Sequence, residues 1–175
     1  MVDLKTLQGS LSDYQRPPLE KWNPPFCGDI DICIKQDGRW FYQGSEITRN
    51  ALVRLFASVL WKESDDYYLK TPAEKVRIEV EDLPFVVVDW QVGDTPQSAI
   101  EVSTNTGERY QLSESHPLIL HNKQPAVQIR DGFLARVHRN VYYQWAELVT
   151  PAQKGEADGF YLQSGSCRFY FGPAS

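Results

Sequence analysis

Four short motifs occur twice along this chain, in the same order and within a few residues of a constant offset. Repetition of ordered motifs at one offset is typical of a duplicated supersecondary unit. We therefore predict two related lobes, and this expectation constrains the fold more than any other feature of the sequence. The repeated motifs are Asp37-Gly38 and Asp131-Gly132, Arg49-Asn50 and Arg139-Asn140, Tyr68-Leu69 and Tyr161-Leu162, and Arg77 and Arg168.

Each copy has the pattern of a β-hairpin, a helix and a second hairpin. In the first copy, apolar and polar residues alternate over Ile30–Ile34 before the Asp37-Gly38 turn, where Gly supplies the positive φ of a tight hairpin. A helix is predicted over Thr48–Trp61, with Thr48 or Asn50 as its N-cap. Its apolar face consists of Leu52, Leu55, Phe56, Val59 and Leu60. The other strands predicted in this copy are Trp40–Tyr42, Tyr67–Leu69 and Val76–Val80.

The second copy follows the same order. A hairpin turns at Asp131-Gly132, a helix opens at Arg139-Asn140, and this helix is expected to bury Val141, Trp145, Leu148 and Val149. Three further strands between the copies, at 85–92, 99–103 and 109–112, should extend the second sheet. The remaining strands predicted in this copy are Ala126–Ile129, Leu134–Val137, Phe160–Leu162 and Cys167–Phe171.

These elements define an α+β fold with antiparallel sheets and one helix on each lobe. We expect an N-terminal arm over residues 1–28, a first hairpin–helix–hairpin lobe over residues 29–82, and a second, larger lobe over residues 83–175. Pro17-Pro18 and Pro24-Pro25 force extended backbone in the arm.

Composition excludes several classes of protein. The chain has 175 residues, 42% of them hydrophobic, and a formal net charge of −5. A protein that coats duplex DNA usually carries a basic surplus, so this partner is not expected. No apolar run approaches the length of a membrane span, and the start lacks the pattern of a signal peptide. Three cysteines without a Cys-x-x-Cys pair favour neither a zinc ribbon nor a disulfide scaffold, so we expect a cytoplasmic location.

No catalytic or cofactor motif stands out, so an enzyme is unsupported and no cofactor is expected. The sequence has no Gly-x-Ser-x-Gly elbow and neither of the common glycine-rich nucleotide loops. Asp29 and Asp31 share one face of a predicted strand and would suit Mg²⁺ beside a substrate phosphate. Alternatively, Asp29 caps the turn after Gly28 while Asp31 faces solvent. Histidines 116, 121 and 138 lack metal-ligand spacing, and the first two are expected in turns.

Several ordered motifs between Pro17 and Trp90 resemble a bacterial family catalogued as domain of unknown function 1285. The resemblance implies two related lobes, the second similar in outline to pleckstrin-homology-like folds, with a ligand site in a cleft between them. It also implies a nucleotide-like or nucleic-acid-based ligand and a role in signal transduction, and it supplies no catalytic residues. The motifs are Gly28–Ile32, Asp37–Gly44, Ile47–Arg49, Leu52–Phe56, Tyr68–Lys75 and Glu81–Phe85.

Positive side chains at the repeated positions are the candidate ligand-binding residues. Arg49 and Arg139 each lie in the first turn of a helix, where backbone N–H groups favour an anion. If the lobes are related by a twofold axis, both arginines would converge on one phosphate or carboxylate, and Lys70, Lys75 and Arg77 would add positive charge. The structural alternative pairs Arg49 and Arg139 with carboxylates such as Glu46 and Asp131.

Aromatic residues interleaved with arginine offer a related hypothesis. Tyr142 and Tyr143 near Arg139, and Tyr170 near Arg168, would stack bases, although core packing is the favoured explanation for such aromatic residues. We therefore predict a non-enzymatic binding module for a small anionic, nucleotide-like ligand. The alternative is a protein–protein adaptor that docks a partner on a sheet edge or on the second lobe.

Overall fold

The computed structural model describes residues 4, 5, 7 and 18–174. The chain divides into two compact units, Met1–Asp82 and Leu83–Ser175. Half of the segment expected as an arm lies outside the described residues, and its end already belongs to a strand because β1 spans Phe26–Ile34. Among the described helices, none is long and apolar enough to cross a membrane.

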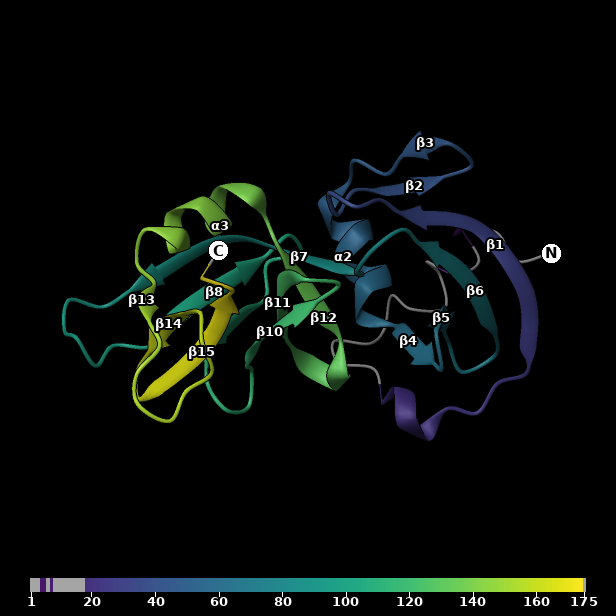
Figure 1. Ribbon diagram of the computed structural model, residues 1–175. Helices are drawn as coiled ribbons and strands as arrows, with labels where there is room; N and C mark the ends of the chain where they lie inside the picture. The colour runs from purple at the N-terminus through teal and green to yellow at the C-terminus, as the bar shows by residue number, and fades with distance from the viewer. Residues whose placement is uncertain (1–3, 6, 8–17, 175) are drawn as a thin grey trace. The chain divides into compact units, whose positions relative to one another are not determined.

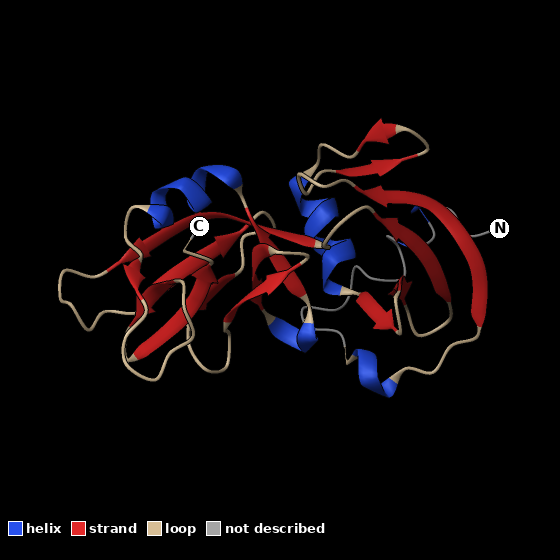
Figure 2. Cartoon of the chain, viewed as in Figure 1, coloured by secondary structure: helices blue, strands red, loops and turns tan. Residues whose placement is uncertain are grey.

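The first unit is built on one six-stranded sheet (Figures 1 and 2). The strand order is β3-β2-β1-β6-β5-β4, and every neighbouring pair is antiparallel except β1 and β6, which run parallel. The first and last strands of the unit in sequence, β1 and β6, are therefore hydrogen-bonded neighbours in the middle of the sheet. The elements are η1 (Leu19–Lys21), β1, β2 (Trp40–Tyr42), β3 (Ser45–Glu46), α2 (Asn50–Ser58), β4 (Leu60–Glu63), β5 (Asp66–Lys70) and β6 (Lys75–Val80).

One face of this sheet forms the core of the first unit. Ile34 and Trp40 are cross-strand partners and both are buried, and the Trp40 ring stacks on Phe56 of helix α2 with centroids 6.4 Å apart. The helix therefore packs on this inner face. The same face also carries the buried residues Ile30, Ile32, Leu60, Leu69, Val76 and Ile78.

Helix α2 ends earlier than the sequence predicts. The predicted helix reached Trp61, but α2 stops at Ser58 and Leu60–Glu63 forms strand β4, which pairs with β5 at four positions. Val59 and Leu60 are buried as expected. The prediction that these apolar side chains face the core is therefore confirmed, and the prediction that they are helical is wrong. Val59 forms the C-cap of α2, and the aromatic residue Trp61 after it favours extended backbone. Neither predicted residue is the N-cap, since Arg49 takes that position.

The second unit contains a six-stranded sheet and a smaller three-stranded one. Their strand orders are β10-β11-β12-β7-β8-β9 and β13-β14-β15. The three predicted additional strands are present and extend the large sheet, where β12 and β7 form its parallel pair. The elements are β7 (Phe85–Val92), β8 (Ile100–Thr104), β9 (Arg109–Gln111), β10 (Leu118–His121), β11 (Gln124–Gln128), η2 (Arg130–Gly132), β12 (Leu134–Val137), α3 (Arg139–Ala146), β13 (Thr150–Pro151), β14 (Phe160–Ser164) and β15 (Cys167–Gly172).

Strand β10 is absent from the sequence prediction, which expected His121 in a turn. His121 instead ends β10 and pairs with Gln124 across a two-residue loop. Asn122 and Lys123 in this loop both have positive φ, 53° and 66°, which is the geometry of a type I′ hairpin. Asn tolerates this conformation well, so the Asn-Lys pair was the missed signal.

The predicted order of hairpin, helix and hairpin occurs in both units, and the α+β class is confirmed. The pairing differs, because the first unit joins its two hairpins in one sheet whereas β14 and β15 stand in a separate sheet. Helix α3 buries Val141 and Trp145 as predicted. The prediction for Leu148 is wrong, since α3 ends at Ala146 and Leu148 is exposed.

Two phenylalanines of the first unit provide a test of this core. Phe56→Ala removes a completely buried ring and should lower the free energy of unfolding by about 3–5 kcal/mol. Phe26→Ala, at a side chain that is 52% exposed, should cost about 1 kcal/mol or less. Urea unfolding followed by tryptophan fluorescence measures both, and equal losses would contradict the assignment of the inner face.

Candidate functional site

The outer face of the first unit's sheet gathers cations and aromatic rings. Cross-strand partners in a sheet point to the same side, so the register decides which side chains meet. Trp61 pairs with Tyr68, Tyr68 with Arg77, and Arg77 with Asp29, which makes one row across four strands. In the next row, Lys75 pairs with both Lys70 and Phe26. We call these seven residues the outer-face cluster.

Rings and cations alternate within the outer-face cluster. The Lys70 amine lies 3.7 Å from the centre of the Trp61 ring, and the Lys75 amine lies 5.0 Å from that of Tyr68. The Arg77 guanidinium is 5.7 Å from the centre of the Phe26 ring, which meets Tyr68 edge to face at 6.0 Å. Separations below about 6 Å allow attraction between cation and ring, so each cation of the cluster is held beside an aromatic ring.

Two of the three cations also have carboxylate partners. Lys75 Nζ lies 2.9 Å from Glu63 Oε1, which also accepts a hydrogen bond from Trp61 Nε1. Arg77 donates two hydrogen bonds to Asp29, from Nε to Oδ1 at 2.7 Å and from Nη2 to Oδ2 at 3.2 Å, and Nη1 lies 3.9 Å from Asp66. Hydrogen bonding to Asp29 raises the pKa of Arg77 above its ordinary value.

Lys70 differs from the other two cations because its side chain is almost enclosed. The residue is only 6% exposed, and burial lowers the pKa of its amine. A residue this enclosed has little surface to offer a ligand. Its place over Trp61 indicates instead that Lys70 orients that ring.

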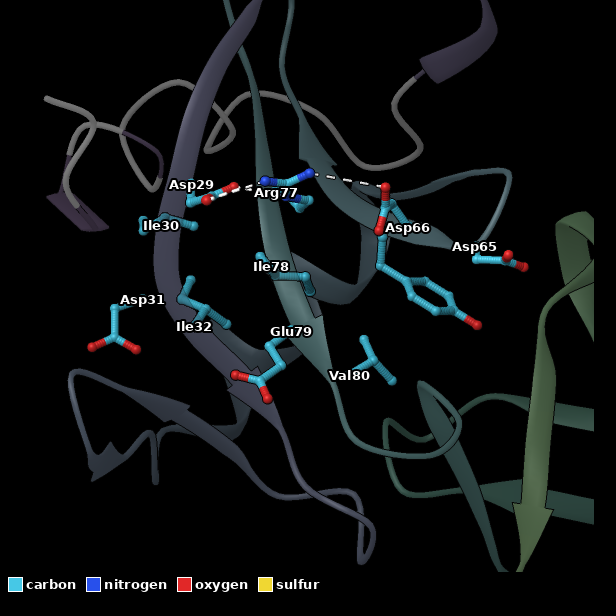
Figure 3. A pocket seen from close by; sticks show the side chains of 11 residues that line it. Asp29, Ile30, Asp31, Ile32, Asp65, Asp66, Arg77, Ile78, Glu79 and Val80 are labelled. Atoms are coloured by element: carbon cyan, nitrogen blue, oxygen red, sulfur yellow. Dashed lines mark hydrogen bonds and ion pairs between the residues drawn. The ribbon is translucent and has the colours of Figure 1, made fainter.

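A pocket of about 410 Å³ opens beside the cluster, where the pairing of β1 and β6 is interrupted (Figure 3). Between the pairs Asp29–Arg77 and Cys33–Glu79, β1 has three residues, Ile30–Ile32, while β6 has only Ile78. Irregularities of this kind bend one strand away from its partner. The two strands therefore separate locally, and Figure 3 shows Asp29 and Arg77 pointing toward each other at one end of this interrupted stretch.

The pocket is acidic with an aliphatic wall. Five carboxylates line it against one guanidinium, that of Arg77, and Figure 3 shows Asp31 and Asp65 on opposite sides of it. Among the described residues, no group of three or more metal-type side chains is arranged to hold a metal ion. Carboxylates that do not converge on a metal ion can instead accept hydrogen bonds from hydroxyl or amine groups of a ligand. The lining residues are Asp29, Ile30, Asp31, Ile32, Asp65, Asp66, Tyr67, Arg77, Ile78, Glu79 and Val80.

The structure brings three of the five predicted ligand residues together on one sheet face. Lys70, Lys75 and Arg77 share the outer face. Arg49 precedes α2, which packs on the inner face, and Arg139 is the first residue of α3 in the second unit. Within residues 18–174 neither arginine forms an ion pair, and Asp131 pairs with Arg130 instead of Arg139. The convergence of Arg49 and Arg139 on one anion stays a prediction.

The alternatives left open by the sequence are also decided in part. Asp31 is exposed between buried Ile30 and Ile32, as the structural alternative predicts. Asp29 lies within β1, where no turn follows Gly28, and it pairs with Arg77, so the alternative of a turn cap is wrong. The Tyr142 ring stacks on Phe171 with centroids 5.0 Å apart, which favours packing over base stacking there.

Two histidines make local contacts in the second unit. His138 Nδ1 accepts the N–H of Asn140 and so caps α3. His116 Nδ1 lies 3.1 Å from the Gln128 carbonyl oxygen.

Sequence reasoning missed the aromatic half of the outer-face cluster. Trp61 was assigned to a helix, and Phe26 lay in the segment expected as an arm. Tyr68 was placed correctly on a strand, but its partners depend on pairing between strands that are distant in sequence. The available signal was the alternation of Trp61 and Tyr68 with buried Leu60 and Leu69.

Comparison with known proteins yields family and structural relatives. A family model described as "Domain of unknown function (DUF1285), N-terminal domain" matches residues 17–83, and one described as "Protein of unknown function (DUF1285), C-terminal domain" matches residues 84–171. No curated protein matches the chain.

Two solved structures are similar to the chain. A DUF1285 family protein from Silicibacter pomeroyi DSS-3 has a TM-score of 0.87 and 35% identity, covering 99% of this chain and 97% of that one. A second, from Shewanella baltica OS155, has a TM-score of 0.55 and 30% identity, covering 66% of this chain and 90% of that one.

The contact between Glu63 and Lys75 predicts a specific acid sensitivity. Hydrogen bonds from Lys75 and Trp61 hold the pKa of Glu63 below its ordinary value of 4.5. Because the folded-state pKa is the lower one, this carboxylate stabilises the fold above pH 4.5 and the contribution is lost as pH falls through the folded-state pKa.

Glu63→Gln should therefore lose less stability than the wild type on acidification, by up to about 1 kcal/mol for an exposed pair. Urea midpoints between about pH 5 and pH 3 measure the difference. Glu46→Gln, an exposed carboxylate on β3 with no ion pair among the described residues, is the control. Parallel acid profiles for wild type and Glu63→Gln would refute the prediction.

Proposed function

This chain belongs to the DUF1285 family, and because that family has no known function we propose one from the side chains themselves: a non-enzymatic module that binds a nucleotide-like ligand on the outer face of its first unit. The observation that carries the proposal is the sharing of one sheet face by three cations and three aromatic rings. A nucleotide offers a phosphate to the cations and a flat base to the rings.

The exposed members of the cluster are suited to direct contact. Phe26 is half exposed, and the Arg77 side chain beside it is 42% exposed. Base stacking on an aromatic side chain contributes about 1–3 kcal/mol per base and tolerates any base. A guanidinium with paired N–H donors matches the geometry of phosphate oxygens. Phe26 and Arg77 are therefore assigned to the base and the phosphate.

The dimensions of the cluster favour a small ligand. Four adjacent strands cover about 14 Å and two rows along a strand about 7 Å, which accommodates one base with its phosphate. Beyond Arg77 the same face becomes acidic at Asp66 and Glu79, and this charge would repel the next phosphate of a strand. The pocket carboxylates that form no ion pair with Arg77, those of Asp31, Asp65 and Glu79, suit ribose hydroxyls, since Asp and Glu accept hydrogen bonds from such groups.

A thermal-shift screen with titration calorimetry tests the proposal. The panel contains AMP, ATP, cyclic nucleotides, a ten-nucleotide single-stranded RNA and glucose 6-phosphate. A ligand at 100 times its Kd stabilises the native state by about 2.7 kcal/mol, a readily visible shift. Free nucleotides should bind in preference to the RNA and to the phosphosugar without a base. A flat response across the panel would overturn the proposal in favour of the protein–protein adaptor.

Phe26→Ala should weaken nucleotide binding by roughly 5- to 150-fold, because it removes one stacking surface. The matched control is Leu148→Ala, which removes a large apolar side chain of similar exposure, 48%, from the second unit. Calorimetric Kd values for AMP measure both variants. Equal affinities of Phe26→Ala and wild type would remove Phe26 from the site.

The two helix-start arginines require a separate test. Arg49 and Arg139 are exposed and lie at the N-terminal ends of α2 and α3, where a ligand anion would find backbone N–H groups. If both contact the same anion, Arg49→Ala and Arg139→Ala should each raise the Kd for AMP without changing the urea midpoint. Unchanged Kd values in both variants would confine the site to the outer-face cluster.

A further inference from the structure

The guanidinium of Arg77 is already bound to a carboxylate of the same chain, that of Asp29. Its Nε and Nη2 groups donate to the two oxygens of Asp29, and this paired arrangement is the one that a phosphate or carboxylate of a ligand would require. A ligand anion and the Asp29 carboxylate therefore compete for the same two N–H groups. Asp66 is not an equivalent competitor, since its oxygen lies 3.9 Å from Nη1.

The pair of Asp29 and Arg77 lies at the surface, where exchange is easy. The side chains are 64% and 42% exposed, and ion pairs with this much water contribute little net stability. Asp29 also lines the adjacent pocket of about 410 Å³, so the displaced carboxylate has open space to turn into. Gly28, with φ of 102°, and the interrupted pairing at Ile30–Ile32 flank it on β1.

The repeat motif offers an internal comparison, because Arg168 is the counterpart of Arg77 in the second unit. The Arg168 guanidinium also binds a carboxylate, that of Glu156, but it donates further hydrogen bonds to Thr150 Oγ1 and to the Pro151 carbonyl. The Arg168 and Glu156 side chains are only 14% and 23% exposed. All three guanidinium nitrogens of Arg168 are thus engaged within the fold, whereas the partners of Arg77, Asp29 and the more distant Asp66, are both exposed.

We propose that Asp29 is an internal counter-ion that occupies the Arg77 guanidinium until a ligand anion displaces it, and that it thereby sets the affinity of the site. This inference rests on the proposed nucleotide-binding function. Asp29 is then a residue that tunes binding through Arg77 and does not contact the ligand. Removing its charge should strengthen anion binding, which is the opposite of what a ligand-contacting side chain would do.

Calorimetric titration with AMP, and with pyrophosphate as an anion without a base, tests the inference. Asp29→Asn should lower the Kd for both probes by about two- to five-fold, the size expected for release of one exposed ion pair. Asp37→Asn is the matched control, because Asp37 forms an exposed pair with Arg39 at 2.8 Å in the same unit and the substitution changes net charge equally.

A double-mutant comparison isolates the route through Arg77. In an Arg77→Ala background, the further change Asp29→Asn should bring no gain, because the donor group that Asp29 occupies is gone. An equal gain in both backgrounds, or an equal gain from Asp37→Asn, would reduce the effect to net charge and overturn the inference. A weaker affinity of Asp29→Asn would make Asp29 a ligand contact and also overturn it.

Failure of the two proposals can be told apart. If wild type binds AMP and Asp29→Asn binds it no more tightly than Asp37→Asn, the inference fails while nucleotide binding stands. If neither wild type nor Asp29→Asn binds either probe, nucleotide binding itself fails and the inference fails with it.

Discussion

The first unit depends on the parallel pairing of β1 and β6. These strands begin and end the unit's sheet in sequence, and their pairing joins the β1–β2–β3 side to the β4–β5–β6 side. The pairing is irregular, and the irregularity has two consequences. It opens a pocket between the strands, and it brings Asp29 opposite Arg77 although the two residues are 48 positions apart. A continuous ladder would leave less space there and would hold both strands more rigidly.

The arginines at corresponding positions of the two repeats, Arg77 and Arg168, have different roles. Arg168 ties β15 to Glu156, Thr150 and Pro151, and these contacts explain its low exposure and its structural role. Arg77 remains at the surface beside an exposed ring, with one carboxylate as its main partner. The surroundings of the motif, more than the motif itself, therefore decide whether the guanidinium is available to a ligand.

The elements that could be predicted from the sequence are those that depend on turn residues and on periodicity within a short stretch of chain. Both Asp-Gly hairpins and the start of α3 follow from a few neighbouring residues. The end of α2 does not, because apolar Val59 and Leu60 fit a helix face and a buried strand equally, and pairing with β5 decides between them. The outer-face cluster was beyond such reasoning, since the contacts of Phe26 with Tyr68 and Arg77 depend on long-range register.

A protein of net charge −5 that binds an anionic ligand needs a way to distinguish that ligand from other anions. Uncompensated surface cations would attract any phosphate, with an affinity governed mainly by ionic strength. In the outer-face cluster, Lys75 and Arg77 are already matched by Glu63 and Asp29, so an anion alone gains little by replacing them. A ligand that also stacks on Phe26 gains the additional stacking energy that a bare anion lacks. Under the proposed function, compensation of the cations turns a general attraction for anions into a preference for anions that carry an aromatic ring.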